Sequence, residues 1–332
     1  MSKFYTVVID TKGSDKGPET IIAGACKALE MFPNLKVCLT GDTSVIEAET
    51  KKLGADSTRI KIVEAPETIT NYDHPVMAIQ TKQNSSLVKA LEELKNNDDY
   101  VGLINAGSTG ALIAGSLRYL RTPELQRPAL AAVLPASNGG FTCLVDTGAN
   151  VDCTPDMLVQ FAHLGSDFMH DLYRIDSPKI GLLSNGAEES KGNKLVKETH
   201  TLLKADDALN FVGNIEGTNA LSGDCDVLVC DGFSGNQVLK NSEGIAKRII
   251  TDIAKYQAKK GSSEYKELID YLVSIYDFNS LGGAIMLGVS KTVIKAHGAA
   301  TSMSIVNTIK MLLNLAENKS IFNNFEGSEY RK

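Results

Sequence analysis

Loops rich in glycine, asparagine and charged residues follow several short apolar segments, and they contain the residue types that can do chemistry. One such loop, residues 105–111, follows apolar residues 100–104 and precedes a helical run that starts at Leu112. Small residues let a backbone approach a ligand closely, and a helix N-terminus favours an anion. A tight turn with a helix N-cap would explain the same residues. The candidate binding residues in this loop are Gly107, Ser108, Thr109 and Gly110.

Residues 10–18 form a second loop, between the first apolar segment and a helix that Pro18 opens. This loop carries two acids and two lysines, which favours a polar ligand site, although a solvated turn has the same composition. Its candidate binding residues are Asp10, Gly13 and Asp15.

Three further polar loops, residues 146–150, 185–193 and 231–236, also begin where apolar segments end. Five such loops in one chain are hard to explain as turns alone. Lys191 offers a cation and Asn236 a neutral amide donor, although Asn236 could also only cap the following helix. The other candidates in these loops are Asn150, Asn193, Asp231 and Gly235.

Residues 295–298 close the series and add two candidates of a second rank, Lys295 and His297. His297 can act as an acid or base, and a hydrogen-bonded structural imidazole is an equally good interpretation.

Several well-known functional motifs are absent from the sequence. It contains no G-x-G-x-x-G fingerprint, Walker A loop, H-E-x-x-H or G-x-S-x-G, and its five histidines lack metal-ligand spacing. These absences oppose a typical nicotinamide enzyme, a P-loop ATPase, a zincin and an α/β-hydrolase. We therefore expect neither a metal nor a cofactor. The six cysteines, none in C-x-x-C spacing, are expected to be reduced and mostly buried.

Short β-branched runs alternate with helical patterns along most of the 332 residues. Most runs are continuously apolar, as expected for strands covered on both faces. This alternation predicts a doubly wound α/β fold with a mostly parallel sheet, in which ligands bind where strands end. We expect a single domain over residues 1–332. Residues 244–278 lack a strand signal and carry two apolar stripes at helical spacing, which predicts a helical hairpin within that domain.

Composition limits the partners and the location. The chain has 34 Lys+Arg and 40 Asp+Glu, which gives a formal charge of −6. This charge argues against electrostatic binding of nucleic acid over the whole surface. The N-terminus lacks the apolar core of a signal peptide, and the two longest uncharged runs are broken by Gly, Ser and Asn. We therefore expect a cytoplasmic protein.

Taken together, the motifs resemble the PlsX family of phosphate:acyl-carrier-protein acyltransferases. The resemblance covers residues 7–316, and its motifs occur in the family's order. They are A-G-x-T-G-A at residues 106–111, R-P-A-L at 127–130, D-x-G-A-N at 146–150, K-G-N at 191–193, D-G-F-x-G-N at 231–236, G-G-A-x-x-L-G at 282–288 and K-A-H-G at 295–298.

The resemblance implies a fold similar to phosphotransacetylases and isocitrate-type dehydrogenases. It also implies transfer of a fatty acyl group from acyl carrier protein to inorganic phosphate, giving an acyl phosphate. In the family that product feeds a glycerol-3-phosphate acyltransferase in phospholipid synthesis. Lys191, Asn236 and His297 are the catalytic candidates that this reading favours. Two alternatives stay open: a coenzyme A-dependent phosphate acyltransferase, and a non-catalytic regulator that binds acyl carrier or lipid.

The chain departs from the family pattern in its first loop, where D-A-M-G-G-D has become D-T-K-G-S-D at residues 10–15. Lys12 puts a cation where the family has a thioether, and Ser14 replaces a glycine. The apolar stripes of the hairpin predict a two-fold homodimer with a four-helix contact, which the resemblance also implies. The resemblance further implies peripheral membrane contact near Lys259 and Lys260 at the tip of the hairpin.

Overall fold

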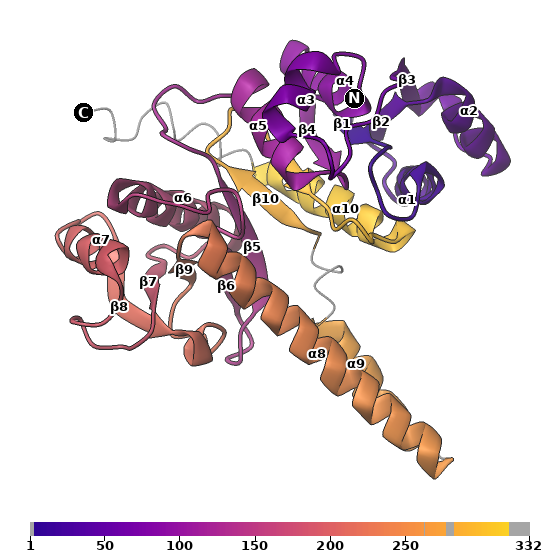
Figure 1. Cartoon of the computed structure of the whole chain (residues 1–332). Coiled ribbons are helices and arrows are strands. Elements are labelled where there is room, and N and C mark those ends of the chain that lie inside the picture. The colour runs from indigo at the N-terminus through magenta and orange to yellow at the C-terminus, as the bar shows by residue number, and fades with distance from the viewer. Residues whose placement is uncertain (1–2, 262, 277–281, 319–332) are drawn as a thin grey trace. The chain divides into compact units, whose positions relative to one another are not determined.

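The computed structural model describes residues 3–261, 263–276 and 282–318, and these fold into two compact units. Unit 1 comprises residues up to Pro128 together with those from Gly282 onward, and unit 2 comprises Ala129–Leu281. Each unit contains a series of mostly parallel strands with helices packed against them (Figure 1). The doubly wound α/β class predicted from the sequence is confirmed. The single domain over residues 1–332 stays a prediction.

The strands of unit 1 follow the order β3-β2-β1-β4-β11-β10. All neighbouring pairs are parallel except β10 and β11. The elements are β1 Tyr5–Asp10, α1 Pro18–Met31, β2 Leu35–Gly41, α2 Thr43–Lys52, the 3-10 turn η1 Ser57–Arg59, β3 Ile60–Glu64, α3 Pro75–Thr81, α4 Ser86–Asn96, β4 Tyr100–Asn105, α5 Thr109–Tyr119, β10 Ala284–Leu287, β11 Val293–Lys295 and α10 Ser302–Asn318.

The strands of unit 1 are apolar because helices cover the sheet. In β1, Val7, Val8 and Ile9 are fully buried. Helix α4 packs on β1, β2 and β4, while α1 packs on α2 and α10. The parallel arrangement brings the carboxyl ends of β1 and β4 side by side, since Asp10 is paired with Asn105. Two of the loops with candidate residues therefore start at one edge of the sheet.

The strands of unit 2 follow the order β5-β6-β9-β7-β8. Among these pairs, only β5 and β6 are antiparallel. Helix α6 packs on β6, β7 and β9, and α7 packs on β7 and β8. The elements are β5 Ala129–Pro135, β6 Phe141–Val145, α6 Pro155–Tyr173, β7 Lys179–Ser184, α7 Lys194–Lys204, β8 Asn210–Glu216, the 3-10 turn η2 Gly217–Asn219, β9 Val227–Val229, α8 Gly232–Lys260 and α9 Lys266–Tyr276.

Helices α8 and α9 form the predicted hairpin, and they lie side by side in Figure 1. Helix α8 begins at Gly232, earlier than the predicted 244, because the loop at 231–236 is itself the first turn of the helix. Residues 277 and 278 of the predicted hairpin lie outside the described residues. In the described part of the chain, no helix has the length and apolar character of a membrane span.

Strand β10 was not predicted from the sequence. It has only four residues, Ala284–Leu287, between glycines at 283 and 288 that both have positive φ. A short apolar run with glycine on either side carries too weak a periodicity to be distinguished from a loop.

Candidate active site

In unit 1 the first loop is fixed to the end of β4 through the buried carboxylate of Asp10. The Asn105 amide donates to Asp10 Oδ2 at 2.8 Å, and the Lys12 N–H donates to Oδ1 at 3.0 Å. Burial raises the pKa of Asp10 to about 6, although these hydrogen bonds oppose the shift. Asn105 Oδ1 also accepts from the Gly107 N–H at 3.0 Å. Asn105, absent from the residues predicted for the site, therefore links the two loops.

Close backbone packing explains the glycines of these loops. Gly13 has φ +82°, and a Cβ at this position would lie 2.9 Å from Gly107 Cα. A Cβ on Gly110 would lie 2.8 Å from the Pro75 ring. Ser108 is the N-cap of α5, because its hydroxyl accepts from the Ala111 N–H. The turn-with-cap interpretation of residues 105–111 is thus correct, and it leaves the N-terminal amides of α5 at the edge of the sheet.

The last loop of unit 1 joins the same edge. The Ala296 N–H donates to Asn105 O at 2.9 Å, and the Asp15 N–H donates to Gly298 O at 2.9 Å. The Lys295 ammonium donates to the backbone oxygen of Ala296. His297 is exposed, and its Nδ1 accepts from the Ala299 N–H at 3.1 Å, which fixes the ring by a backbone contact. Unit 1 therefore brings together nine predicted residues: Asp10, Gly13, Asp15, Gly107, Ser108, Thr109, Gly110, Lys295 and His297.

Lys12 is held by the loop that follows β3. Its ammonium donates to Pro66 O at 2.9 Å. The Lys12 ammonium, which replaces a thioether of the family pattern, is therefore bound to a backbone oxygen.

In unit 2 the turn after β6 is organised by Asp146, which is fully buried. Asp146 Oδ1 accepts the N–H groups of Leu130, Gly148 and Ala149 at 2.9–3.1 Å. Its Oδ2 accepts the backbone and side-chain N–H groups of Asn150 at 2.7 and 2.9 Å. Asp146 belongs to the D-x-G-A-N motif, but the sequence did not identify its side chain as part of the site.

The same turn fixes the start of α8. Asn150 O accepts the Gly232 N–H at 2.7 Å, and a Cβ on Gly235 would collide with Asp146 O. The N-cap of α8 is Asp231, whose Oδ1 accepts the Ser234 N–H at 2.8 Å. The interpretation of Asn236 as the cap is therefore wrong. No hydrogen bond to the Asn236 amide is found within the described chain, and Gly148 borders it.

Lys191 lies on a braced loop between β7 and α7. Asn185 Oδ1 accepts the Gly192 N–H at 2.8 Å, and the Asn214 amide donates to Glu188 O at 2.9 Å. Lys204 on α7 pairs with Glu189 at 2.8 Å. Lys191 itself is exposed, and its ammonium has no ion-pair partner among residues 3–261, 263–276 and 282–318.

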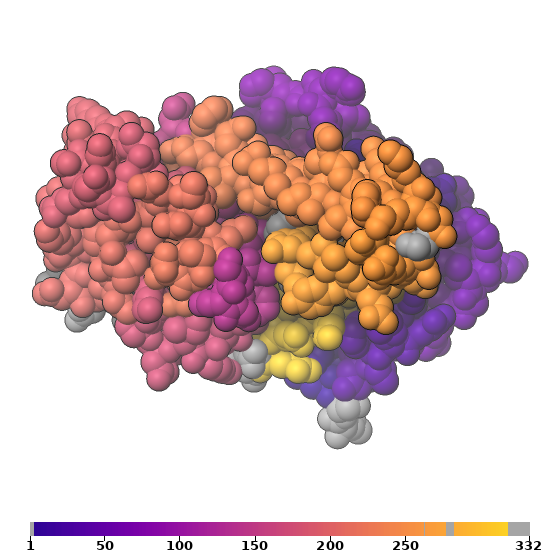
Figure 2. All heavy atoms as spheres, turned by 90° about the horizontal axis from the view of Figure 1, so that it is seen from below, coloured from indigo at the N-terminus to yellow at the C-terminus, as the bar shows by residue number. Residues whose placement is uncertain are grey.

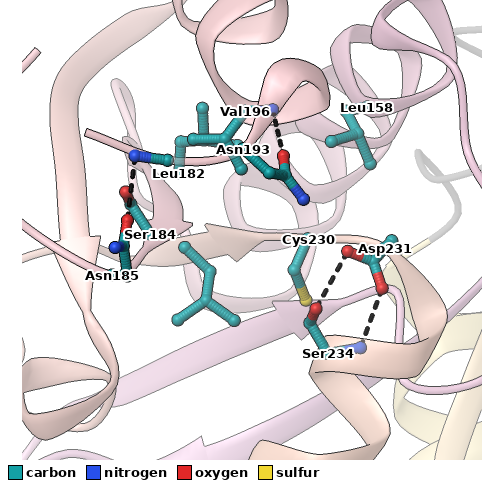
Figure 3. A pocket seen from close by; sticks show the side chains of 11 residues that line it. Leu158, Leu182, Ser184, Asn185, Asn193, Val196, Cys230, Asp231 and Ser234 are labelled. Atoms are coloured by element: carbon teal, nitrogen blue, oxygen red, sulfur yellow. Dashed lines mark hydrogen bonds between the residues drawn. The ribbon is translucent and has the colours of Figure 1, made fainter. Parts of the chain in front are cut away.

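A cavity of about 440 Å³ opens where β7 and β9 end (Figure 3). Its wall comes from those strand ends, from α6 and from the first turns of α7 and α8. The apolar lining consists of Leu158, Leu182, Leu183, Val196 and Cys230, and the remaining lining consists of Ser184, Asn185, Gly192, Asn193, Asp231 and Ser234. Asn193 and Asp231 are the N-caps of α7 and α8, so both helices point their first amides toward this region.

Neither cysteine of this region is suited to be a nucleophile. Burial and nearby acids raise the pKa of Cys153 to about 12, and burial raises the pKa of Cys230 well above its ordinary range. Within the described residues, no group of three or more His, Cys, Asp or Glu side chains could hold a metal ion.

The family profile described as "Fatty acid synthesis protein" matches residues 5–322 of the chain. The phosphate acyltransferase of Clostridium novyi (strain NT) is 39% identical over 318 residues, covering 94% of this chain and 95% of that protein. The chain belongs to the PlsX family of phosphate acyltransferases. Another relative of that name, from Caldanaerobacter subterraneus subsp. tengcongensis, is 42% identical over 319 residues and 94% of each chain.

Solved structures agree on the fold. A phosphotransacetylase from Streptococcus pyogenes matches with a TM-score of 0.60 at 17% identity, covering 95% of each chain. The EutD phosphotransacetylase from Staphylococcus aureus matches with a TM-score of 0.59 at 14% identity, covering 95% of this chain and 94% of that one. The phosphotransacetylase-like fold expected from the resemblance is confirmed, and the chain is an enzyme of the PlsX family.

Proposed function

We propose that this enzyme transfers a fatty acyl group from acyl carrier protein to inorganic phosphate, and that the acyl phosphate serves phospholipid synthesis. Membership of the phosphate acyltransferase family supports the reaction class. One observation supports placing this reaction at the loops that carry Lys191 and Asn236. Lys191 and Asn236, which match the family's K-G-N and D-G-F-x-G-N motifs, present a cation and an amide that have no partner in the described chain.

The reaction needs no redox change. One oxygen of hydrogen phosphate attacks the thioester carbonyl carbon, a C–O bond forms and the C–S bond breaks. The proton of hydrogen phosphate goes to the departing sulfur, so the products are an acyl phosphate and a free thiol. The barrier comes from bringing a dianion to the carbonyl and from the negative charge that develops on the carbonyl oxygen.

Two side chains of unit 2 fit these demands. Lys191 would attract and hold the phosphate as a point charge, since its ammonium is exposed and unpaired in the described chain. Asn236 would donate to the developing oxyanion, because its amide is not used to cap α8. The high pKa of the Cys153 thiol supports direct attack by phosphate, because little thiolate exists near neutral pH.

The loops of unit 1 would take a binding role. The N-terminal amides of α5, beside Gly107 and Thr109, are a separate candidate site for an anionic group. Asp10 would position the first loop from its buried site. His297 would act as an acid or base of second rank, from a ring whose Nδ1 accepts a backbone N–H.

The hairpin supports a proposal about assembly. Ile245 and Ile249 on α8 and Tyr271 on α9 are each more than half exposed, and in Figure 2 these two helices, in orange, form one continuous surface. We propose that a second copy of the chain covers this surface in a homodimer. At the tip, the rings of Tyr256 and Tyr265 lie 5.8 Å apart with Lys260 over them, a combination that suits peripheral contact with an anionic membrane.

A cytoplasmic location and a downstream glycerol-3-phosphate acyltransferase complete the proposal. The competing reaction uses acyl-coenzyme A, and the competing class is a regulator without turnover. An assay that supplies phosphate with either acyl-acyl carrier protein or acyl-coenzyme A, and traps acyl phosphate with hydroxylamine, distinguishes these three functions. Hydroxamate from the carrier-protein donor alone supports the proposal, hydroxamate only from the coenzyme A donor favours the second reaction, and none from either favours the regulator.

The variants Lys191→Ala and Asn236→Ala test the roles of the two residues in the same assay. Removing one well-placed oxyanion donor costs on the order of 10²–10³ in rate. Both variants should stay folded, because neither side chain has a partner in the described chain. A variant with nearly wild-type turnover would remove its residue from the site.

A further inference from the structure

The backbone of Lys191 is bonded to a carbonyl oxygen that a side chain from β8 also contacts. Glu188 O accepts the Lys191 N–H at 2.9 Å and the Asn214 amide at 2.9 Å. A carbonyl oxygen has two lone pairs, so these two donors fill it. Asn214 is 6% exposed, whereas Glu188 and Lys191 are exposed. A buried strand residue therefore anchors the exposed segment that carries the proposed phosphate cation.

The stem of the Lys191 side chain is fixed on the same loop. Gly186 is buried, and a Cβ at that position would lie 2.7 Å from Lys191 Cγ and 3.2 Å from Lys191 Cβ. The first methylene groups of the lysine thus pack directly on the backbone of Gly186. Because both the N–H and the stem of Lys191 contact residues 186–188, the place of its ammonium depends on where these residues are held.

A β-bulge directs the Asn214 side chain toward this loop. Ile180 of β7 is paired with Phe211 of β8. Two residues later, Leu182 is paired with Asn214, so β8 contains one extra residue between the two pairs. Gly213, beside the bulge, has φ +101°, a conformation that favours glycine. Because side chains alternate along a strand, the extra residue puts Asn214 on the face of Phe211, whose ring contacts α7.

Asparagine is a costly residue at this buried position. Asn214 Oδ1 is buried and has no hydrogen-bond partner within the described chain. A buried polar atom without a partner destabilises a fold, and an apolar side chain of the same shape would avoid that penalty. Leucine has this shape. The bond to Glu188 O is therefore the feature that favours asparagine over leucine at residue 214.

The other contacts of the loop are weaker anchors. Glu189 pairs with Lys204 of α7, but both side chains are more than 60% exposed, and exposed ion pairs contribute little. The bond from the Gly192 N–H to Asn185 Oδ1 lies within the loop and does not connect it to a neighbouring strand. The position of the loop relative to β8 therefore depends chiefly on the Asn214 amide.

We propose that Asn214 is a positioning residue for the transfer reaction, because its amide, through Glu188 O, holds Lys191 where the ammonium meets phosphate. The inference rests on the proposed function and adds to it the part of the fold that orients the cation. Asn214 is buried and acts through Lys191, without touching phosphate or the acyl donor. Loss of its amide should therefore weaken the use of phosphate and leave recognition of the acyl donor unchanged.

Steady-state kinetics of two variants test this role. Asn214→Leu removes the amide and keeps the shape, and Asn214→Ala removes it without any risk of overpacking. In both, kcat/KM for phosphate should fall about tenfold, with the Michaelis constant for the acyl donor within about twofold of the wild type. Asn210→Leu is the matched control, because Asn210 also lies on β8 and its amide donates to Ser177 O, outside the Lys191 loop. Its kinetics should equal those of the wild type.

Two measurements distinguish positioning from a general loss of stability. The midpoint of urea unfolding of Asn214→Leu should equal or exceed that of the wild type, because the unpartnered Oδ1 is gone. In a Lys191→Ala background, Asn214→Leu should change kcat/KM for phosphate by less than about twofold, because the cation that it orients is already absent. A further tenfold loss in that background, or a lower midpoint with unchanged kinetics, would overturn the inference.

Hydrogen exchange of the Lys191 N–H tests the anchor without turnover. Asn214→Leu and Asn214→Ala should raise its exchange rate about threefold to tenfold, the range for one neutral hydrogen bond, and Asn210→Leu should leave it unchanged. Faster exchange in a protein that forms no acyl phosphate from any donor would refute the proposed function while the anchoring of Lys191 stands. Unchanged exchange together with normal use of phosphate in both Asn214 variants would overturn the inference while the proposed function stands.

Discussion

Replacing Asp146 by alanine tests whether this carboxylate organises the site in unit 2. Its two oxygens accept five N–H groups, from Leu130, Gly148, Ala149 and twice from Asn150. A net contribution of about 1 kcal/mol for each bond gives an upper value near 5 kcal/mol. The turn after Asp146 is half-exposed, so water can replace some of these bonds, and we expect a loss of about 3–5 kcal/mol.

Native-state hydrogen exchange measures this loss where it occurs, as the opening free energy of residues 146–150 and 231–236. Asp146→Asn keeps one acceptor oxygen and loses the bonds to Asn150, so it should lose about 2 kcal/mol. Asp156→Ala is the control, since that exposed acid in the first turn of α6 should contribute less than about 1 kcal/mol.

Turnover should fall together with local stability. Gly148 borders Asn236, so loosening the turn displaces the proposed oxyanion donor, at a cost on the order of 10²-fold in rate. If the opening free energy falls by less than about 1 kcal/mol in Asp146→Ala, the carboxylate does not hold the turn and the reasoning is refuted.

Three further predictions concern the other loops and the hairpin. Burial raises the pKa of Asp10 to about 6, so its stabilising contribution is present when the carboxyl is protonated and is lost as the pH rises through 6. In urea unfolding, the free energy of unfolding of the wild type should therefore fall between pH 5 and pH 8 by roughly 1–2 kcal/mol more than that of Asp10→Asn. If the two free energies differ by the same amount at both pH values, the pKa of Asp10 is not raised. Lys12→Met should change the Michaelis constant for phosphate by less than about twofold, because the Lys12 ammonium is bound to Pro66 O. A change above about fivefold at low salt would show instead that the Lys12 ammonium contacts the substrate. Replacing Ile249 and Ile253 by Asp would put unpaired charge into the proposed dimer contact, so light scattering after size exclusion should show monomers or aggregates; a stable dimer would locate the interface elsewhere.

The sequence predicts the strands and the positions of the polar loops well. Buried parallel strands read as continuous apolar runs, and the residue that ends each run marks the start of a loop. Ser108 and Asp10 were found in this way, at the ends of β4 and β1. The exception is β10, because its run Ala284–Leu287 contains one β-branched residue and lies between two glycines.

Roles within a loop depend on contacts that the sequence does not show. In D-G-F-S-G-N, both Asp231 and Asn236 are good capping residues, and only the folded chain shows that Asp231 caps α8. Asp146 looks like one more strand-end acid until the turn folds its donors onto it. The sequence likewise does not show that the Ser184 hydroxyl is buried without a hydrogen-bond partner in the described part of the chain.

The central claim is direct transfer of the acyl group to phosphate, and simultaneous measurement of free thiol and acyl phosphate tests it most directly. With acyl carrier protein as donor, we predict one thiol per acyl phosphate at every phosphate concentration, and no thiol release without phosphate. A burst of about one thiol per chain without phosphate would reveal an acyl-enzyme instead. Thiol release with no acyl phosphate, or no reaction at all, would contradict the account as a whole.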